Sequence, residues 1–596
     1  MIRLLKCFDK WAYLLIIFVI GLVILQVYCD LELPTRLTNI LTHASIAEAA
    51  SKNGILTEEL KKTCTDGIMQ NGLEMFGFAG ISLVSSILVC FLASRIAAKF
   101  SYNVRKEVYT HIQKFSISEI DKFSTASLIT RTTNDITQVQ MVVIMTLRMA
   151  IAAPTMAILG IIKAGKIEAS NSLSLIVIIA VITLCILVIS IFLIVLPKFK
   201  KIQELTDKLN LVTRENLTGI RVVRANSAQE YQESKFDHVN QNVAKTQIFV
   251  NRVLNIMMPG MTIIMNGTSL AILWVGAYII DENPLFLGSV FGFQQITMMI
   301  VMAFMQLIMI FIMVPRGLVS ARRVKEILVV EPSLSNKEVP LTPREEVKGE
   351  IEYKDVSFSY PNSSENVLDR ISFKASQGDT IAIIGSTGSG KTSLINLLPR
   401  FFDATSGQVL VDGVDVRDYD LKLLREKIGF IAQKALLFKG TVRSNLAYGK
   451  ENATEAEMIE ALQLAMADDF ILKHSEGLDQ KVAQGGSNFS GGQKQRLSIA
   501  RALIKKTEIL VFDDSFSALD FKTDKTLRDN LKKLDYTPTK IIVAQRIGTI
   551  LDADLILVLE KGKIVGAGKH EELIKTCEVY QEIAYSQISK EEMDCA

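Results

Sequence analysis

Long apolar runs occupy the first half of the chain, and stretches that carry charge separate most of them. Ile, Leu, Val, Met and Phe dominate these runs, and each is as long as, or longer than, the ~20 residues that a helix needs to cross ~30 Å of hydrocarbon. The runs lie near residues 11–29, 73–98, 141–163, 172–197, 247–280 and 285–314. The buried core of a soluble protein is a poor alternative for six runs of this length. The pattern therefore predicts a membrane domain with six spanning helices over residues 1–314.

The connections between these runs differ in length and charge. Residues 99–140 and 198–246 are long, helical in pattern and rich in Lys and Arg, whereas residues 164–171 and 281–284 are short. Because an excess of Lys and Arg marks cytoplasmic loops, we expect the two long loops and both termini to lie in the cytoplasm. We expect a multi-pass protein of the plasma membrane, with an organellar membrane as the alternative.

The second half of the chain has a different pattern, in which short strand-like runs alternate with helical stretches. Clear examples of the strand-like runs are IEYKDVSFSY, TIAIIG, EILVFDD and KIIVAQR. This alternation is typical of an α/β domain. The pattern predicts a linker over residues 315–350, one α/β domain over residues 351–590, and a C-terminal tail at residues 591–596.

Composition narrows the classes of partner. The 596 residues are 49% hydrophobic and carry a formal net charge of only +3, so bulk electrostatics gives no case for a nucleic-acid partner. The seven cysteines show no C-x-x-C spacing, which argues against a metal site or a disulfide framework. The expected surroundings of the first half are instead a lipid bilayer.

A glycine-rich stretch in the second half predicts a nucleotide site. GSTGSGKT at residues 385–392 matches the phosphate-loop pattern G-x-x-x-x-G-K-[ST], between a strand-like run and a helical one, as the motif requires. The glycines let backbone N–H groups close on phosphate oxygens, Lys391 reaches the β- and γ-phosphates, and the Thr392 hydroxyl can bind Mg²⁺. The predicted ATP-binding residues of this stretch are Gly385, Ser386, Thr387, Gly388, Ser389, Gly390, Lys391, Thr392 and Ser393.

Two further motifs complete the candidate chemistry. The run EILVFDD delivers Asp513 as a partner of Mg²⁺. Between it and the phosphate loop lies NFSGGQKQRLSIARAL at residues 488–503, where a serine and two glycines open a helix and form a second anion-binding N-terminus. Because one phosphate loop already serves one nucleotide, a second anion site on the same domain suggests a nucleotide bound across a dimer.

SGGQKQRLSIARAL, the phosphate loop and the aspartate after it resemble the ATP-binding cassette (ABC) family over essentially the whole chain. With six spans ahead of the cassette, the chain resembles a half-transporter of the exporter type. The resemblance implies a multidomain membrane protein, in which a six-helix all-α transmembrane domain is fused to a cytoplasmic α/β P-loop nucleotide-binding domain. It also implies the cofactors ATP and Mg²⁺.

The resemblance assigns roles to matching positions outside the phosphate loop. Tyr360 is expected to stack on adenine, and Gln433 to contact both Mg²⁺ and the membrane domain. Asp520 is expected to lie along the dimer seam. The signature residues, expected to bind the γ-phosphate of ATP held by a partner subunit, are Ser490, Gly491, Gly492 and Gln493.

The chain departs from the family pattern at its two catalytic positions. Asp514 stands where the family places a glutamate that polarises the attacking water, and Gln545 stands where it places a histidine. Aspartate retracts the carboxylate by one C–C bond, about 1.5 Å, and a misplacement of ~1 Å can cost about a hundredfold in rate. Glutamine can donate a hydrogen bond to the γ-phosphate but cannot become an imidazolium. We therefore expect this site to bind ATP and to hydrolyse it slowly or not at all.

The signature keeps every phosphate-facing residue, and only its leading leucine is replaced, by Phe489. This asymmetry favours a heterodimer whose partner, a second ABC half-transporter, supplies the competent catalytic residues, a pattern similar to that of bacterial heterodimeric multidrug exporters. A homodimer with two weak sites is the alternative. In the long loops, residues 121–135 and 215–226 resemble the segments through which exporters press on their cassettes.

The cargo is less well specified by the sequence. Ten of the twenty methionines fall between Met257 and Met313, and flexible, polarisable methionine suits varied apolar substrates, although packing explains these residues equally well. Arg148 and Gln306 are polar groups inside predicted spans. We predict ATP-driven export of amphipathic or hydrophobic small molecules, with export of lipid or peptide, or an ATP-gated channel, as alternatives.

Overall fold

The chain forms two compact units in the computed structural model. One unit comprises Met1–His111 and Ala126–Val330, and the other comprises Ile112–Thr125 and Glu331–Ala596. The structure describes residues 8–52, 54–166, 171–337, 339–341, 347–361, 363 and 365–587. The predicted tail at 591–596 lies outside these described residues.

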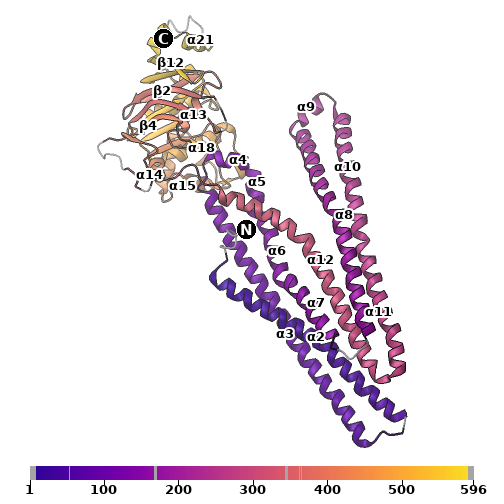
Figure 1. Cartoon of the computed structure of the whole chain (residues 1–596). Coiled ribbons are helices and arrows are strands. Elements are labelled where there is room, and N and C mark those ends of the chain that lie inside the picture. The colour runs from indigo at the N-terminus through magenta and orange to yellow at the C-terminus, as the bar shows by residue number, and fades with distance from the viewer. Residues whose placement is uncertain are drawn as a thin grey trace. The chain divides into compact units, whose positions relative to one another are not determined.

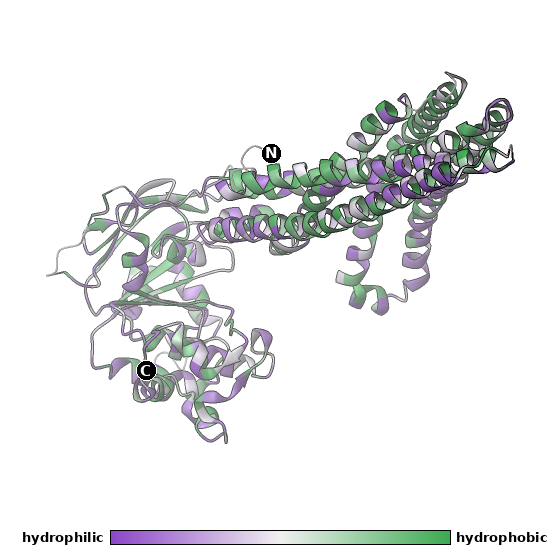
Figure 2. Cartoon of the chain, turned by 90° about the horizontal axis from the view of Figure 1, so that it is seen from below, coloured by the Kyte–Doolittle hydropathy of each residue, from purple (hydrophilic) through white to green (hydrophobic). Residues whose placement is uncertain are grey.

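The first unit is built from long helices. Among the described residues, six helical stretches are long and apolar enough to cross a membrane, which confirms the six predicted spans. Figure 2 shows hydrophobic positions along these helices. Helices wholly or mainly in this unit are α2 (Lys10–Lys52), α3 (Glu58–Ile112), α5 (Thr125–Thr130), α6 (Ile136–Met145), α7 (Ile151–Ala164), α8 (Asn171–Thr218), α9 (Ile220–Ala225), α10 (Gln229–Asn255), α11 (Met257–Glu282) and α12 (Leu287–Val329), with π-helical turns η1 (Arg131–Asp135) and η2 (Thr146–Ala150) and a 3-10 turn η3 (Pro284–Phe286).

These helices extend well beyond the apolar runs that identified them. The long loop predicted at 198–246 consists of the end of α8, the short helix α9 and most of α10, with α8 and α10 lying side by side (Figure 1). Helix α12 likewise continues through Pro315 to Val329, so the linker predicted to begin at residue 315 begins inside a helix. Hydropathy marks only the lipid-facing length of a helix, and the amphipathic continuation of α12 buries Val324, Ile327 and Leu328.

A short piece of the long loop predicted at residues 99–140 belongs to the second unit. Helix α4 (Ile117–Phe123) lies in the segment Ile112–Thr125, which clusters with the α/β domain. The Ser116 N–H donates to Glu119 Oε2 at 2.7 Å, which closes the first turn of α4, and Ser333 Oγ donates to Ser116 Oγ at 3.1 Å. Only the start of the coupling segment predicted at 121–135 therefore joins the α/β domain.

The second unit contains a six-stranded sheet in the order β12-β11-β3-β10-β9-β6. Its strands are β3 (Thr380–Gly385), β6 (Ile428–Ile431), β9 (Ile509–Asp513), β10 (Thr539–Val543), β11 (Leu555–Glu560) and β12 (Lys563–Gly568). All neighbours are parallel except the pair of β11 and β12. A second sheet pairs β2 (Leu368–Ala375), β1 (Ile351–Phe358), β4 (Ser406–Val411) and β5 (Val414–Asp415) in that order, and a short ribbon pairs β7 (Gly440–Thr441) with β8 (Lys481–Val482).

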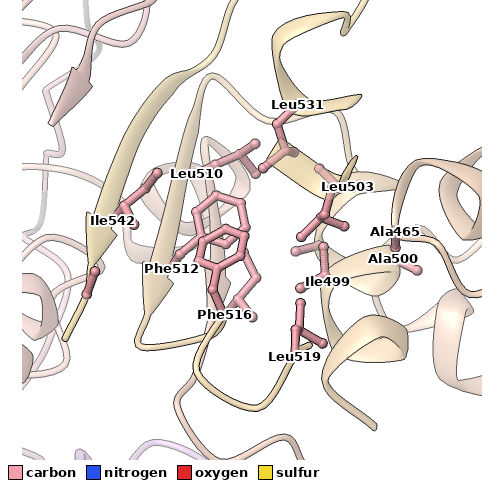
Figure 3. Packing of buried hydrophobic residues seen from close by; sticks show 14 of the residues in the cluster. Ala465, Ile499, Ala500, Leu503, Leu510, Phe512, Phe516, Leu519, Leu531 and Ile542 are labelled. Carbon is pink, nitrogen blue, oxygen red and sulfur yellow. The ribbon is translucent and has the colours of Figure 1, made fainter. Parts of the chain in front are cut away.

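Helices cover the six-stranded sheet, which explains why its strands read as continuous apolar runs. Phe512 of β9 lies beside Phe516 and faces Ile499 and Leu503 of α18 (Gly491–Leu503) in the close-up of this core (Figure 3). The helices of the α/β domain are α13 (Lys391–Asn396), α14 (Leu421–Glu426), α15 (Val442–Ala447), α16 (Glu455–Leu464), α17 (Asp468–Ile471), α18 (Gly491–Leu503), α19 (Phe521–Lys532), α20 (His570–Thr576) and α21 (Glu578–Tyr585).

The parallel strands bring three loops to one edge of this sheet. In register, Val543 at the end of β10 pairs with Ile383 of β3 on one side and with Asp513 of β9 on the other. The chain therefore leaves β3, β9 and β10 at the same edge. Ligands of open α/β sheets bind outside the carboxyl ends of such strands, so this edge is the place to look for a site.

Candidate nucleotide-binding site

The phosphate loop connects β3 to α13, and its glycines are required by its backbone. Gly390 has φ +100°, and a Cβ there would lie 2.8 Å from Leu368 Cδ2 and 2.9 Å from the Val367 carbonyl oxygen. A Cβ on Gly385 would clash with the carbonyl oxygen of Leu559. Both positions need glycine for conformation or for space, and the resulting cradle of backbone N–H groups suits phosphate.

Lys391 begins helix α13 and lies folded over its own loop. Its Nζ donates to the carbonyl oxygens of Gly385 at 2.9 Å and Ser386 at 2.8 Å. Burial lowers the pKa of this ammonium, and the negative charges of Asp514 and Asp513 oppose that change. The ammonium is therefore held between the loop and two acids, where phosphate oxygens can replace the carbonyl groups that it now contacts.

Asp513 ends β9 and faces the hydroxyl of Thr392. Thr392 Oγ1 donates to Asp513 Oδ1 at 3.1 Å. Burial raises the pKa of the Asp513 carboxyl, while the hydrogen bond from Thr392 opposes the rise. A hydroxyl, a carboxylate and the amide oxygen of Gln433 are oxygen donors of the kind that Mg²⁺ prefers.

The donor set also indicates how such an ion is held. Within the described part of the chain, no three His, Cys, Asp or Glu side chains cluster to hold a metal ion by themselves. Mg²⁺ usually binds through one or two carboxylates, waters and the phosphates of a nucleotide. The residues present therefore fit Mg²⁺ bound together with a nucleotide.

Asp514, the next residue, is held by two glutamine side chains. Its Oδ2 accepts from Gln545 Nε2 at 2.8 Å and from Gln433 Nε2 at 3.2 Å. Its backbone has φ +47°, in the left-handed region that aspartate tolerates better than most residues, and its N–H donates to the Val543 carbonyl at 3.0 Å. The two positions at which the chain departs from the family pattern are thus in direct contact.

The phosphate loop and these acids line a single cleft of about 290 Å³. Of the residues predicted from the sequence, the lining contains Thr387, Gly388, Gly390, Lys391, Thr392, Ser393, Gln433, Asp513, Asp514 and Gln545. Val367 and Val543 also line the cleft. The sequence did not identify these two because an apolar residue in or next to a strand carries no motif.

Several predicted ATP residues lie beside this cleft without lining it. Tyr360 hydrogen-bonds through its hydroxyl to Ser393 Oγ at 2.9 Å and packs edge-on against Phe358 and Phe402. Its predicted contact with adenine remains a prediction. The predicted loop residues outside the lining are Gly385, Ser386 and Ser389.

The signature residues lie at the N-terminus of α18, away from the cleft lining. Ser490 Oγ accepts from the Gln493 N–H at 3.3 Å, and Gln493 Oε1 accepts from the Ser490 N–H at 2.9 Å. A Cβ on Gly491 would meet no atom within 4 Å, and a Cβ on Gly492 would lie 3.2 Å from the Ala518 carbonyl oxygen. Asp520 caps α19 by accepting from the Thr523 N–H at 3.0 Å.

The membrane unit contains a cavity of about 590 Å³ with many methionines. Those in its lining are Met141, Met145, Met149, Met156, Met298, Met299 and Met302. Four of the seven come from the stretch formed by α6, η2 and α7, and three from α12, so α11 contributes none of them. The polar residues of the lining include Gln26, Asp30, Arg148 and Gln306. The methionine count along the sequence pointed to the fifth and sixth spans, and the third was missed.

Both parts of the chain match a known protein family. Residues 368–517 match the ABC transporter family, and residues 14–304 match the ABC transporter transmembrane region. An uncharacterized ABC transporter ATP-binding protein of Mycobacterium tuberculosis is 39% identical, over 92% of this chain and 94% of its own length. A protein of Bacillus subtilis, provisionally named a multidrug export ATP-binding/permease protein, is 32% identical over 81% of this chain and 83% of its own length.

The fold is also that of a solved exporter. The structure of a bacterial Atm1-family ABC exporter with ATP bound superposes with a TM-score of 0.77, and the match covers 96% of this chain and 98% of that one. Sequence identity to it is 22%, so the likeness concerns the fold alone.

Proposed function

This chain belongs to the ABC transporter family, and we propose that it is the degenerate-site subunit of a heterodimeric exporter in the plasma membrane. Both termini and the cassette lie in the cytoplasm. Its own phosphate loop binds ATP with Mg²⁺ and turns it over slowly or not at all, while a second half-transporter supplies the competent site. The cargo is an amphipathic or hydrophobic small molecule.

The contact of Asp514 with Gln433 and Gln545 carries this proposal. A general base must reach the water whose proton it takes, and the Asp514 carboxylate is one C–C bond, about 1.5 Å, shorter than a glutamate. One of its oxygens already accepts from two amides, at 2.8 and 3.2 Å. A carboxylate that is both retracted and engaged by two donors is poorly placed to polarise a water at the γ-phosphate.

The other residues of the cleft keep the groups needed for binding. Backbone N–H groups of the phosphate loop and the Lys391 ammonium neutralise phosphate charge, and Thr392, Asp513 and Gln433 are the residues that would hold Mg²⁺. An Mg²⁺ ion held by these residues would supply positive charge that offsets the negative charge of the phosphates. Binding and hydrolysis are therefore separable in this chain, since the phosphate loop and the Mg²⁺-binding residues hold the nucleotide, whereas hydrolysis also requires a competent general base at position 514.

The signature supports a shared site on the partner. Ser490 and Gln493 hold each other at the N-terminus of α18, and Gly491 leaves its approach open. Backbone N–H groups at a helix N-terminus bind anions. This chain thus offers an intact γ-phosphate site to a nucleotide bound by the partner, whose own glutamate and histidine would perform hydrolysis.

The methionine-lined cavity supports the proposed cargo class. Thioether side chains are flexible and polarisable and adapt to varied apolar shapes. Gln26, Gln306, Asp30 and Arg148 add hydrogen-bonding and charged groups to the same lining, which suits molecules with both polar and apolar parts. The provisional name of the Bacillus subtilis relative agrees with cargo of this kind.

ATP turnover by the purified chain tests the degenerate site. The chain is reconstituted alone in nanodiscs as wild type, Asp514→Glu, Gln545→His and the double variant, with Lys391→Ala in the double background as the control for contaminating ATPases. We expect negligible turnover by the wild type and a rise of at least tenfold in the double variant. Robust turnover by the unmodified chain would mean that aspartate suffices, and the heterodimer proposal would lose its main support.

A further inference from the structure

A glutamine beyond the last helix is bonded to the loop that carries Gln545. Gln587 Nε2 donates to the backbone carbonyl of Gln545 at 2.7 Å, and Gln587 Oε1 accepts from the Ile547 N–H at 2.9 Å. The side-chain amide of Gln587 therefore bonds to both a backbone carbonyl and a backbone N–H of the same short stretch. We call this stretch, residues 544–547, the switch loop.

Helix α21 places Gln587 at this position. Tyr580 and Ala584 are fully buried on one face of α21, which anchors the end of the helix, and Gln587 lies in the turn that follows it. The Tyr580 hydroxyl is hydrogen-bonded to His570 Nδ1 at 2.7 Å, and the Gln587 N–H donates to the Ala584 carbonyl at 3.0 Å. The backbone of Gln587 is thus fixed by buried contacts, although the residue itself is exposed.

The switch loop needs such a partner at Ile547. Ile547 opens the 3-10 helix η6 (Ile547–Thr549), and the preceding Arg546 makes no side-chain cap there. The first N–H groups of a helix have no partner within it. Because Ile547 is fully buried, an unbonded N–H would be costly, and Gln587 Oε1 satisfies it.

The side chains of the held stretch reach the nucleotide cleft and the loop between β9 and α19. Gln545 Nε2 donates to Asp514 Oδ2 at 2.8 Å. The Arg546 guanidinium donates to the backbone carbonyls of Ser517 at 3.3 Å and Leu519 at 3.5 Å. Any movement of the loop backbone would therefore shift the amide that contacts Asp514.

We propose that Gln587 is a positioning residue that fixes the switch loop, and through it directs the Gln545 amide toward Asp514 and the γ-phosphate. This inference rests on the proposed function, because it takes the cleft to bind ATP. It makes the C-terminal end of the cassette a determinant of ATP recognition, although Gln587 contacts no residue of the phosphate loop in the described structure.

Amide hydrogen exchange of the full chain in nanodiscs tests the contact itself, without nucleotide. In Gln587→Ala, the peptide that contains Ile547 should exchange about five- to tenfold faster, the change expected from the loss of about one hydrogen bond. Gln581→Ala is the matched control, because Gln581 lies on α21 and donates instead to the Ile574 carbonyl at 2.8 Å. Unchanged exchange at Ile547 in Gln587→Ala would overturn the proposal.

Nucleotide affinity tests the consequence. Gln587→Ala should weaken MgATP binding about three- to tenfold and leave MgADP binding unchanged, because only ATP carries the γ-phosphate that Gln545 faces. Gln545→Ala should show the same selective loss, and the double variant Gln545→Ala/Gln587→Ala should lose no more than Gln545→Ala alone. Additive losses, or equal losses for ATP and ADP, would refute action through Gln545.

The two experiments separate this inference from the proposed function. If the wild-type chain fails to bind MgATP at all, the proposed function is wrong, and the exchange of the Ile547 amide still reports whether Gln587 holds the loop. If ATP binds normally in all variants while Ile547 exchange rises, Gln587 stabilises the loop without positioning Gln545, and the proposal fails.

Discussion

Two adjacent acids at the end of β9 have different surroundings. Asp513 is the last residue of the strand and accepts from Thr392 across the cleft. Asp514 turns into a left-handed backbone conformation, so its side chain points to a different set of neighbours and accepts from Gln433 and Gln545. One residue of backbone thus separates a carboxylate suited to Mg²⁺ from one held by amides.

A single added methyl group should disrupt the phosphate loop. Gly390→Ala would place a Cβ 2.8 Å from Leu368 Cδ2 and would force alanine to φ +100°. Both effects distort the loop, since residues other than glycine are strained there. We expect at least a tenfold loss of MgATP affinity, measured by equilibrium binding to the full chain.

Gly413→Ala is the control for this prediction. Gly413 also has positive φ, at +77°, but a Cβ there would meet nothing within 4 Å. Gly413→Ala should therefore lower stability through strain alone and leave ATP affinity within about twofold. Normal ATP affinity in Gly390→Ala would show that the loop tolerates the clash.

At the scale of elements, helix α4 is joined to the α/β domain by a network around Glu119. The Glu119 carboxylate accepts from the Ser116 N–H at 2.7 Å and from Ser118 Oγ at 3.1 Å. Burial alone would raise the pKa of Glu119, but hydrogen bonds from Ser116, Ser333 and Ser118 outweigh it and hold the pKa below its ordinary value. The charged form is therefore favoured in the folded state.

This pKa shift predicts an acid-sensitive contact. Because the folded-state pKa lies below the unfolded value, the carboxylate stabilises the fold at pH 7, and this contribution is lost as pH falls below about 4.5 and through the folded pKa. Glu119→Gln should lower the free energy of unfolding by about 1 kcal/mol at pH 7, or the Tm of the cassette by about 2–4 °C. The difference from wild type should shrink at pH 4.

Thermal unfolding of the full chain in detergent at the two pH values measures this effect. Asp121→Asn, which neutralises another acid on the same helix, is the control. An equal destabilisation by both substitutions, or a difference that does not depend on pH, would contradict the role assigned to the Glu119 charge.

At the scale of the whole molecule, the proposed heterodimer makes the two nucleotide sites unequal. In a complex copurified with the partner, Gly491→Asp should lower ATP turnover at least a hundredfold, because a carboxylate at the signature repels the γ-phosphate of the ATP bound by the partner. Helix N-termini favour acidic residues, so α18 should tolerate the substitution. Lys391→Ala in this chain should lower turnover less than tenfold, since it disables only the degenerate site.

ATP turnover at saturating MgATP, measured for the Gly491→Asp complex and the Lys391→Ala complex, distinguishes an asymmetric heterodimer from a symmetric dimer. In the partner, the corresponding two substitutions should have the opposite order of effect. Replacing its phosphate-loop lysine should lower ATP turnover more than placing an aspartate in its signature. If Lys391→Ala here is as damaging as Gly491→Asp, both sites hydrolyse ATP, and a homodimer or a symmetric heterodimer explains the data better.

Features that depend on neighbouring residues could be predicted from the amino-acid sequence alone. Six apolar runs of spanning length predicted six membrane helices, because hydrocarbon thickness fixes the number of residues that must be apolar. The phosphate loop was identifiable because its glycines, lysine and threonine meet phosphate as one local segment. The alternation of strand and helix patterns likewise predicted the α/β cassette domain.

Contacts between residues far apart in the chain became apparent only from the folded arrangement of its strands and helices. Gln433, Asp514 and Gln545 follow three different strands, and parallel pairing of β6, β9 and β10 brings them to one edge of the sheet. Three further features join residues far apart in the chain. Gln587 contacts the switch loop, methionines of α6, η2, α7 and α12 line one cavity, and α4 clusters with the cassette unit. Such contacts depend on packing in three dimensions, which no local pattern of residues records.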